Sequence, residues 1–153
     1  MTNILKDVWE DHDRRGACWL PRDVFSAAGF DLRRLSAGRY NPAFGRGIVE
    51  LVRIARGCLV DALRFVELVP VREAGIRRHC IWALGMAVLT LRRISARPAF
   101  GSGREVKISR RSVRAVSTVG SWAARSNWAL GVLFNALVRG LPGSAERPAA
   151  GGL

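Results

Sequence analysis

The amino-acid sequence predicts an all-α fold. Apolar residues recur at helical spacing, no stretch alternates apolar and polar residues as a half-buried strand does, and the prolines fall at or beyond the ends of the periodic stretches. The chain has 153 residues, 49% of them hydrophobic, which is enough to bury one core. We therefore expect one helical domain over residues 1–140, followed by a disordered tail rich in small residues over 141–153.

Two helices are expected at the start of the chain. The first should run from about residue 2 to 13, because Gly16 and Pro21 interrupt the sequence that follows. A short helix capped by Asp23 and ending at Gly29 should come next.

The two longest helices should occupy the middle of the chain. Asn41 and Pro42 form a good N-cap and first-turn pair for a helix that reaches Val69. Another helix is expected from about Glu73 to Ser95, and a proline follows the end of each helix.

The last third begins with a glycine-rich loop over residues 100–103 and a basic segment. A final helical region is expected from about Ser109 to Arg139, with an interruption near Gly120.

The chain is strongly basic, with 25 Lys and Arg against 12 Asp and Glu and a net charge of +13. Such a surface attracts anions, including nucleic acid, acidic lipid headgroups and diphosphates. A non-enzymatic basic helical protein that binds nucleic acid or acidic membranes is therefore one alternative, supported by the cluster from Arg104 to Arg114. Because no DNA- or RNA-binding motif is evident, no nucleic-acid partner is expected.

The cysteines indicate a reducing compartment. Cys18, Cys58 and Cys80 are odd in number and widely spaced, which argues against a zinc site or a disulfide framework. No signal peptide opens the chain, and its most apolar stretch, residues 80–91, is too short to span a bilayer. We expect a cytoplasmic protein that is compatible with peripheral membrane contact.

The opening segment carries the most informative pattern. Asp7 and Asp11 are four residues apart and Glu10 lies between them, so all three carboxylates project from one face of a helix. Their repulsion would be offset by a divalent cation, and Mg²⁺ is usually held by one or two carboxylates together with waters and phosphates. The alternative is a solvated acidic helix end.

Two segments resemble a known family. Residues 3–11 (N-I-L-K-D-V-W-E-D), with the loop at 14–25, resemble the second aspartate-rich motif of the squalene and phytoene synthases. Residues 85–91 and the basic segment 106–111 (V-K-I-S-R-R) resemble the late helix and K-I-x-K/R segment of squalene synthases. The likeness spans about residues 2–142, is greatest to bacterial squalene synthases, and implies the C-terminal part of an isoprenoid-synthase-type helical bundle.

The resemblance implies a prenyl diphosphate substrate and a magnesium-dependent transferase. Asp7 and Asp11 would be catalytic and would bind Mg²⁺, with Glu10 as a further ligand of the metal. The residues implied to bind substrate are Lys6, Arg14 and His79.

Several of these residues have alternative interpretations. Lys6 could instead pair with Glu10 within the helix. His79 stands where the family has a phenylalanine, and could instead extend a basic patch with Arg77 and Arg78. Four aromatic residues could face a carbocation, although ordinary core packing is the simpler role: Trp9, Trp19, Phe65 and Trp82.

NADPH is the cofactor that the squalene branch implies. Its binding residues would be Asn3, Lys107, Ser109 and Arg110, where Ser109 replaces the arginine of the family pattern. The alternative is a solvated basic loop. No G-x-G-x-x-G or P-loop motif is present, so no Rossmann-type site is expected.

The family uses two aspartate-rich motifs on facing helices, and this sequence contains one D-x-x-x-D. The resemblance therefore implies that an N-terminal half is missing and that the fragment alone is inactive. The complete enzyme would join two farnesyl diphosphates head-to-head through presqualene diphosphate and reduce the product to squalene. A phytoene or presqualene-diphosphate synthase is the closest alternative.

Overall fold

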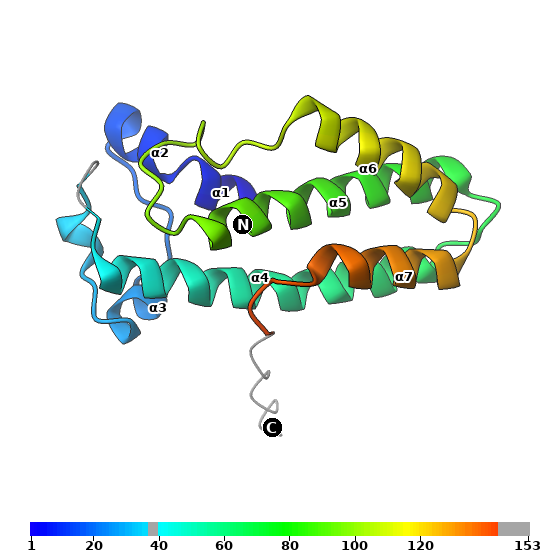
Figure 1. Ribbon diagram of the computed structural model, residues 1–153. Coiled ribbons are helices and arrows are strands. Elements are labelled where there is room, and N and C mark those ends of the chain that lie inside the picture. The colour runs from blue at the N-terminus through cyan, green and yellow to red at the C-terminus, as the bar shows by residue number, and fades with distance from the viewer. Residues whose placement is uncertain (37–39, 144–153) are drawn as a thin grey trace, which may run out of the picture.

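A computed structural model describes residues 1–36 and 40–143, and every regular element in these two ranges is a helix. The prediction of an all-α fold is confirmed. The two long helices lie side by side and antiparallel, with a helical pair along one end and short helices at the other (Figure 1). The elements are α1 (Thr2–Lys6), α2 (Val8–Arg15), α3 (Arg22–Ala27), a 3₁₀ turn η1 (Leu32–Arg34), α4 (Pro42–Leu68), α5 (Ala74–Ala96), α6 (Arg110–Ala123) and α7 (Asn127–Val138).

The central helices begin and end close to where the sequence predicts. Asn41 caps α4, because its Oδ1 accepts a hydrogen bond of 2.8 Å from the backbone N–H of Ala43, and Pro42 occupies the first turn. The helix ends at Leu68, and α5 begins at Ala74. No helix in the described ranges combines the length and the apolarity needed to cross a bilayer.

The short third helix has a different cap from the one predicted. Pro21 occupies the N-cap position, and Asp23 lies within the first turn without capping it. Gly29 follows the helix with a φ of +80°, a conformation that favours glycine, so the predicted stop is close to the observed one. Asp31 instead caps η1, and hydrogen bonds from the side chain and backbone of Arg33 lower the pKa of its carboxyl group.

The predicted interruption of the last helical region is present, but it falls after Gly120. Helix α6 continues through Gly120 to Ala123, and the break falls at residues 124–126. Gly120 serves close packing, because a Cβ at this position would lie 2.8 Å from Cγ2 of Ile81 on α5. Ser126 starts the next helix by accepting a 3.4 Å hydrogen bond from Ala129.

An aromatic cluster fixes the N-terminal helices against α4. Phe44 lies at the centre, with ring centroids 5.5 Å from Trp9, 5.2 Å from Phe25 and 5.3 Å from Phe30. All four side chains are buried, and separations in this range are typical of favourable aromatic pairs. The cluster therefore gives α2 a fixed position next to the start of α4.

Arg77 is buried at the opposite end of the bundle. Its side chain is 0% exposed, and its guanidinium donates to the carbonyls of Val66 (3.0 Å), Val69 (2.5 Å) and Ala124 (2.7 Å) and to Oδ1 of Asn127 (2.6 Å). The interpretation of residues 77–79 as an exposed basic patch is therefore wrong for Arg77, which joins α4, α5, α6 and α7.

The packed structure extends past the predicted domain boundary at residue 140. Leu141 is buried in the core, and Nη1 of Arg56 donates to the carbonyls of Leu141 (3.2 Å) and Pro142 (2.8 Å). Residues 144–153 of the predicted tail lie outside the described residues.

Candidate active site

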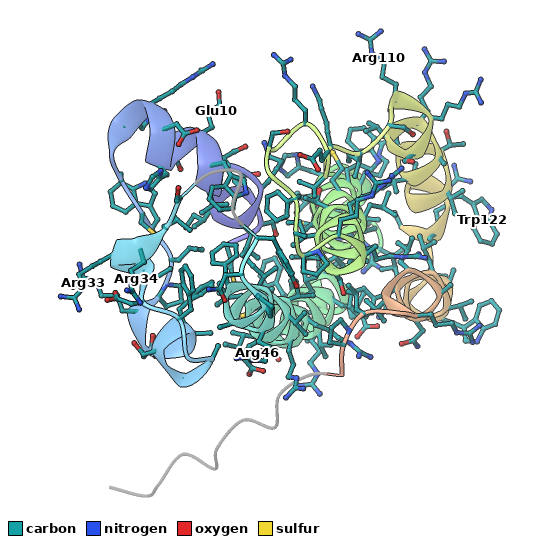
Figure 2. All side chains as sticks on the ribbon, turned by 60° about the vertical axis from the view of Figure 1, so that its left-hand side comes forward. Glu10, Arg33, Arg34, Arg46, Arg110 and Trp122 are labelled. Atoms are coloured by element: carbon teal, nitrogen blue, oxygen red, sulfur yellow. The ribbon has the colours of Figure 1, made fainter. Side chains whose placement is uncertain are left out.

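The three carboxylates of the opening segment line one surface groove of about 530 Å³. The groove follows α1 and α2, and Figure 2 shows Glu10 pointing outward from this part of the molecule. The lining residues are Asn3, Ile4, Asp7, Glu10, Asp11, Arg14, Arg15 and Trp19. Both oxygen ligands suited to a hard cation and basic groups suited to an anion therefore face the same space.

The helix is interrupted at Asp7, which was not predicted. The backbone of Asp7 has φ −99° and ψ 10°, and it separates α1 from α2. Helical hydrogen bonds nevertheless continue across the break, from Asp7 N–H to the Asn3 carbonyl (2.8 Å) and from Asp11 N–H to the Asp7 carbonyl (2.9 Å). The break therefore changes the helix locally and leaves Asp7 and Asp11 on the same groove.

Each carboxylate is paired with a basic neighbour. Asp7 Oδ1 lies 2.6 Å from Lys6 Nζ. Glu10 Oε1 lies 2.7 Å from Arg14 Nη1, and Asp11 Oδ1 lies 3.0 Å from Arg15 Nη1. The alternative that Lys6 pairs with Glu10 is therefore wrong.

The sequence interpretation overlooked Arg15, although its i,i+4 spacing from Asp11 was a signal for it. These pairs offset the repulsion between the carboxylates. The Asp11 side chain is 15% exposed and that of Glu10 is 53% exposed, so Asp11 is the more shielded of the two.

The glycine-rich loop before α6 packs against α2 and against the helix break at Asp7. Trp9 Nε1 donates a buried hydrogen bond of 2.6 Å to the carbonyl of Phe100. Gly103 packs on the helix break so closely that a Cβ there would lie 2.9 Å from the carbonyl oxygen of Lys6. Glu105 closes the loop by accepting hydrogen bonds from Gly101 N–H (3.0 Å) and Ser102 Oγ (3.2 Å). The sequence predicted a loop here, but not that it positions the acidic segment.

The groove offers two aspartate carboxylates that suit Mg²⁺, but it does not supply a complete set of ligands for the ion. In the described part of the chain, no three His, Cys, Asp or Glu side chains converge closely enough to hold a metal ion. Proteins usually hold Mg²⁺ through one or two carboxylates, and water and substrate phosphates supply the other ligands. The two aspartates that line this groove match that number. Asp7 and Asp11 would hold such an ion.

The residues implied to bind NADPH lie in two places. Asn3 lines the acidic groove, whereas Lys107, Ser109 and Arg110 are exposed and are not among its lining residues. Ser109 has a structural role, because its Oγ accepts a 3.1 Å hydrogen bond from Ser112 N–H and caps α6. Of the four residues, only Asn3 therefore lines this groove.

His79 is exposed in the second turn of α5 and does not line the groove. Figure 1 shows α1 beside the other half of α5, toward its C-terminal end. The four aromatic candidates are also dispersed. Trp9 is buried in the core, Trp19 is 63% exposed at the groove, and Phe65 and Trp82 are exposed on α4 and α5. Core packing is confirmed for Trp9 alone.

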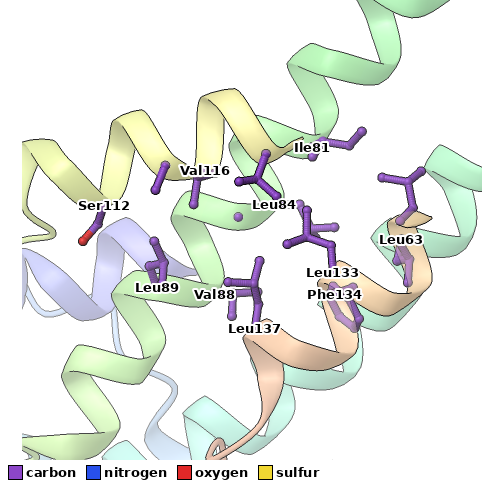
Figure 3. A pocket seen from close by; sticks show the side chains of 14 residues that line it. Leu63, Ile81, Leu84, Val88, Leu89, Ser112, Val116, Leu133, Phe134 and Leu137 are labelled. Atoms are coloured by element: carbon purple, nitrogen blue, oxygen red, sulfur yellow. The ribbon is translucent and has the colours of Figure 1, made fainter. Parts of the chain in front are cut away.

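An apolar cavity of about 250 Å³ lies between α4, α5, α6 and α7 (Figure 3). Thirteen of the residues around it are apolar or glycine, and Ser112 adds a hydroxyl group that contacts Ser109. The cavity and the acidic groove share no lining residue. The acidic groove and the apolar cavity are therefore separate sites.

Comparison with known proteins identifies the family. The model of the family described as squalene/phytoene synthase matches residues 1–112, which include the acidic groove, the loop that packs on it and the first turn of α6. Neither the curated proteins nor the solved structures contain a match to this chain. The all-helical architecture agrees with the isoprenoid-synthase-type bundle that the sequence predicts. The chain belongs to the squalene/phytoene synthase family.

Proposed function

We propose that the acidic groove is the diphosphate-binding half-site of a squalene-synthase-like prenyltransferase. The observation that carries the proposal is the placement of Asp7 and Asp11 on one groove with Arg14 and Arg15. Lys6 does not line the groove but forms an ion pair with Asp7. When bound, Mg²⁺ would supply Lewis-acid neutralisation of the charge that develops on a departing diphosphate. The carboxylates provide oxygen ligands, and the basic side chains can turn from their ion pairs toward phosphate oxygens.

We further propose that a second carboxylate set must come from another polypeptide segment. The 153 residues contain a single D-x-x-x-D, and the described residues present no three metal-ligating side chains together. The chain is then the part that corresponds to the C-terminal half of a bacterial squalene synthase. The complete site would condense two farnesyl diphosphates through presqualene diphosphate, with NADPH reducing the product to squalene.

One observation favours a non-reducing branch as the second candidate. Ser109 stands where the squalene pattern has an arginine, and its hydroxyl group caps α6. A phytoene-type or presqualene-diphosphate synthase would need no hydride donor at this position.

Binding of inorganic pyrophosphate in the presence of Mg²⁺, measured by isothermal titration calorimetry, tests the half-site. We expect Asp7→Asn and Asp11→Asn each to weaken binding by at least about tenfold, the scale of losing an interaction in a metal site. Asp13→Asn is the matched control, because Asp13 is exposed on the same helix, contacts His12 and does not line the groove. Equal binding by the wild type and the Asp7 and Asp11 variants would overturn the proposal, as would an equal loss in the control.

The product branch needs a second experiment. The chain is combined with a separately expressed polypeptide that carries the first aspartate-rich motif of this family, and farnesyl diphosphate and Mg²⁺ are added with or without NADPH. We expect no released diphosphate from the chain alone, and a hydrocarbon from the mixture. A hydrocarbon that forms only with NADPH supports the squalene branch, and an NADPH-independent product supports the alternative. Turnover by the chain alone would contradict the need for a second carboxylate set.

A further inference from the structure

Helices α6 and α7 form a hairpin that carries basic residues but no acidic residue. Residues 106–143 contain no Asp or Glu. The hairpin and its turn carry four arginines, Arg110, Arg111, Arg114 and Arg125. Within the described ranges, none of the four takes part in an ion pair. The end of the molecule that contains α1 and α2 differs, because three basic side chains there form ion pairs with three carboxylates. The hairpin therefore presents an uncompensated cationic surface.

The same hairpin exposes two tryptophans. Trp122 near the end of α6 is 64% exposed, and Trp128 at the start of α7 is 76% exposed. Figure 2 shows Trp122 pointing away from the bundle. Large apolar side chains gathered on a surface indicate an interaction site, and tryptophan in particular is enriched where protein meets the headgroup region of a membrane.

Charge and aromatic groups share one face of α6. Arg111, Arg114 and Trp122 are spaced by three and eight residues, so they fall on one stripe of the helix, and all three are exposed. On α7, Trp128 and Val132 are four residues apart and also exposed. The residues of α6 that are buried lie on its other side, and these are Val116, Gly120 and Ala123. Helix α6 is therefore amphipathic, with its inner face packed on α5 and its outer face free.

The turn between the two helices is held rigidly. Arg77 donates to the Ala124 carbonyl (2.7 Å) and to Oδ1 of Asn127 (2.6 Å), and Asn127 Nδ2 donates to the Glu67 carbonyl (3.1 Å). Trp122 and Trp128 lie on either side of this anchored turn. Both indoles are thus presented from fixed backbone, which lowers the ordering cost of binding.

We propose that the outer surface of the α6–α7 hairpin, formed by Arg111, Arg114, Trp122, Trp128 and Val132, binds the surface of an anionic lipid bilayer. The indoles would lie at headgroup level, where an amphipathic ring suits the boundary between water and hydrocarbon. The arginines would lie against anionic headgroups, whose surface potential attracts juxtamembrane cations.

Charge complementarity favours an anionic bilayer as the partner of this surface. Two copies of the hairpin would bring uncompensated arginines together, which opposes self-association through this face. The family match ends at residue 112, so most of the hairpin lies outside it, and the proposal does not depend on prenyl transfer.

Vesicle co-sedimentation of the full chain tests the proposal, with phosphatidylcholine vesicles prepared with and without phosphatidylglycerol. We expect binding to the anionic vesicles only. Arg111→Gln with Arg114→Gln should weaken it roughly thirtyfold at low salt, from the typical contribution of each basic residue near an anionic surface. Arg33→Gln with Arg34→Gln is the matched control, because both residues are exposed and the pair removes the same net charge.

A second pair of variants tests the indoles. Trp122→Ser with Trp128→Ser should weaken binding at least about tenfold and abolish the blue shift of tryptophan fluorescence on adding vesicles. Trp19→Ser, which removes a tryptophan of similar exposure (63%) in the acidic groove, should leave both unchanged.

Several results would overturn the proposal: equal binding to neutral vesicles, equal losses in the control variants, or a dimer in solution that the Trp122 and Trp128 substitutions dissociate. Tight binding to a nucleic-acid oligonucleotide that competes with vesicles, and that the tryptophan substitutions do not weaken, would assign the surface to nucleic acid instead. Circular dichroism of each variant separates loss of binding from loss of folding.

Discussion

Replacing the buried arginine of α5 by methionine tests how the bundle is held together. In the wild type the Arg77 guanidinium donates four hydrogen bonds, and two of its acceptors, the Val66 and Ala124 carbonyls, are in buried contacts. Methionine fills a similar volume but donates nothing. The other two acceptors, the Val69 carbonyl and the Asn127 side chain, are partly buried and can turn to water.

The expected cost follows from the two buried acceptors. Leaving a buried polar group without a partner costs about 1–3 kcal/mol, so the Arg77→Met variant should lose roughly 2–6 kcal/mol of unfolding free energy. That is a large share of the roughly 5–15 kcal/mol that is typical of folded domains.

Urea unfolding followed by circular dichroism measures this loss, with the slope against denaturant checked for constancy. Arg78→Met is the matched control. Arg78 is the adjacent residue, it is exposed, and its Nε donates only within α5, to the Ala74 carbonyl at 3.2 Å. The control should stay within about 0.5 kcal/mol of the wild type. If Arg77→Met also stays within that range, an apolar side chain replaces the network at no cost and the reasoning is refuted.

Three further substitutions address the acidic segment and the helix that follows its loop. Trp9→Phe removes the donor to a buried loop carbonyl and should cost about 1–3 kcal/mol in urea unfolding, whereas an unchanged midpoint would show that the hydrogen bond is dispensable. Gly103→Val places a side chain against the Lys6 carbonyl and should lower stability by about 1–3 kcal/mol and weaken Mg²⁺-dependent pyrophosphate binding; unchanged affinity would separate the loop from the site. Ser109→Ala removes the cap of α6 and should lower the free energy of unfolding by about 1 kcal/mol. Thr118→Ala is the control, because it removes an exposed hydroxyl group from the middle of the same helix. An equal loss in this control would contradict a capping role for Ser109.

The helix bounds could be predicted because their signals are local. Asn41 and Pro42 specify the start of α4 through one side-chain hydrogen bond and one fixed φ angle, and neither depends on tertiary structure. The break between α6 and α7 was misplaced because Gly120 was interpreted as a helix breaker. Its true role, allowing close contact with Ile81, depends on a residue of another helix.

The sequence contained a signal that Arg77 is buried, but the charge of the side chain argued for an exposed residue. Counted back from Ile81 and Leu84, Arg77 falls at i−4 and i−7, on the apolar stripe of α5. The spacing thus favours burial, whereas composition favours exposure. What could not be read from the sequence is that the ends of two helices, α4 and α6, would bring three carbonyl acceptors to one point, which makes a buried guanidinium tolerable.

The acidic groove shows why like charges on one helix face do not by themselves establish a metal site. Each carboxylate already has a basic partner within 3.0 Å, so the segment is electrostatically balanced without a cation. Exposed pairs of this kind contribute only about 0.2–1 kcal/mol each, so breaking them to bind a cation would cost little.

In the proposed function, the same arginines and lysine would become available to an anion if the carboxylates turned to a metal. A site of this composition therefore favours joint binding of metal and diphosphate over binding of either alone. The basic residues of α1 and α2 are then as much a part of the proposed chemistry as the aspartates, and the motif is better described as a set of paired carboxylates and cations than as an acidic cluster.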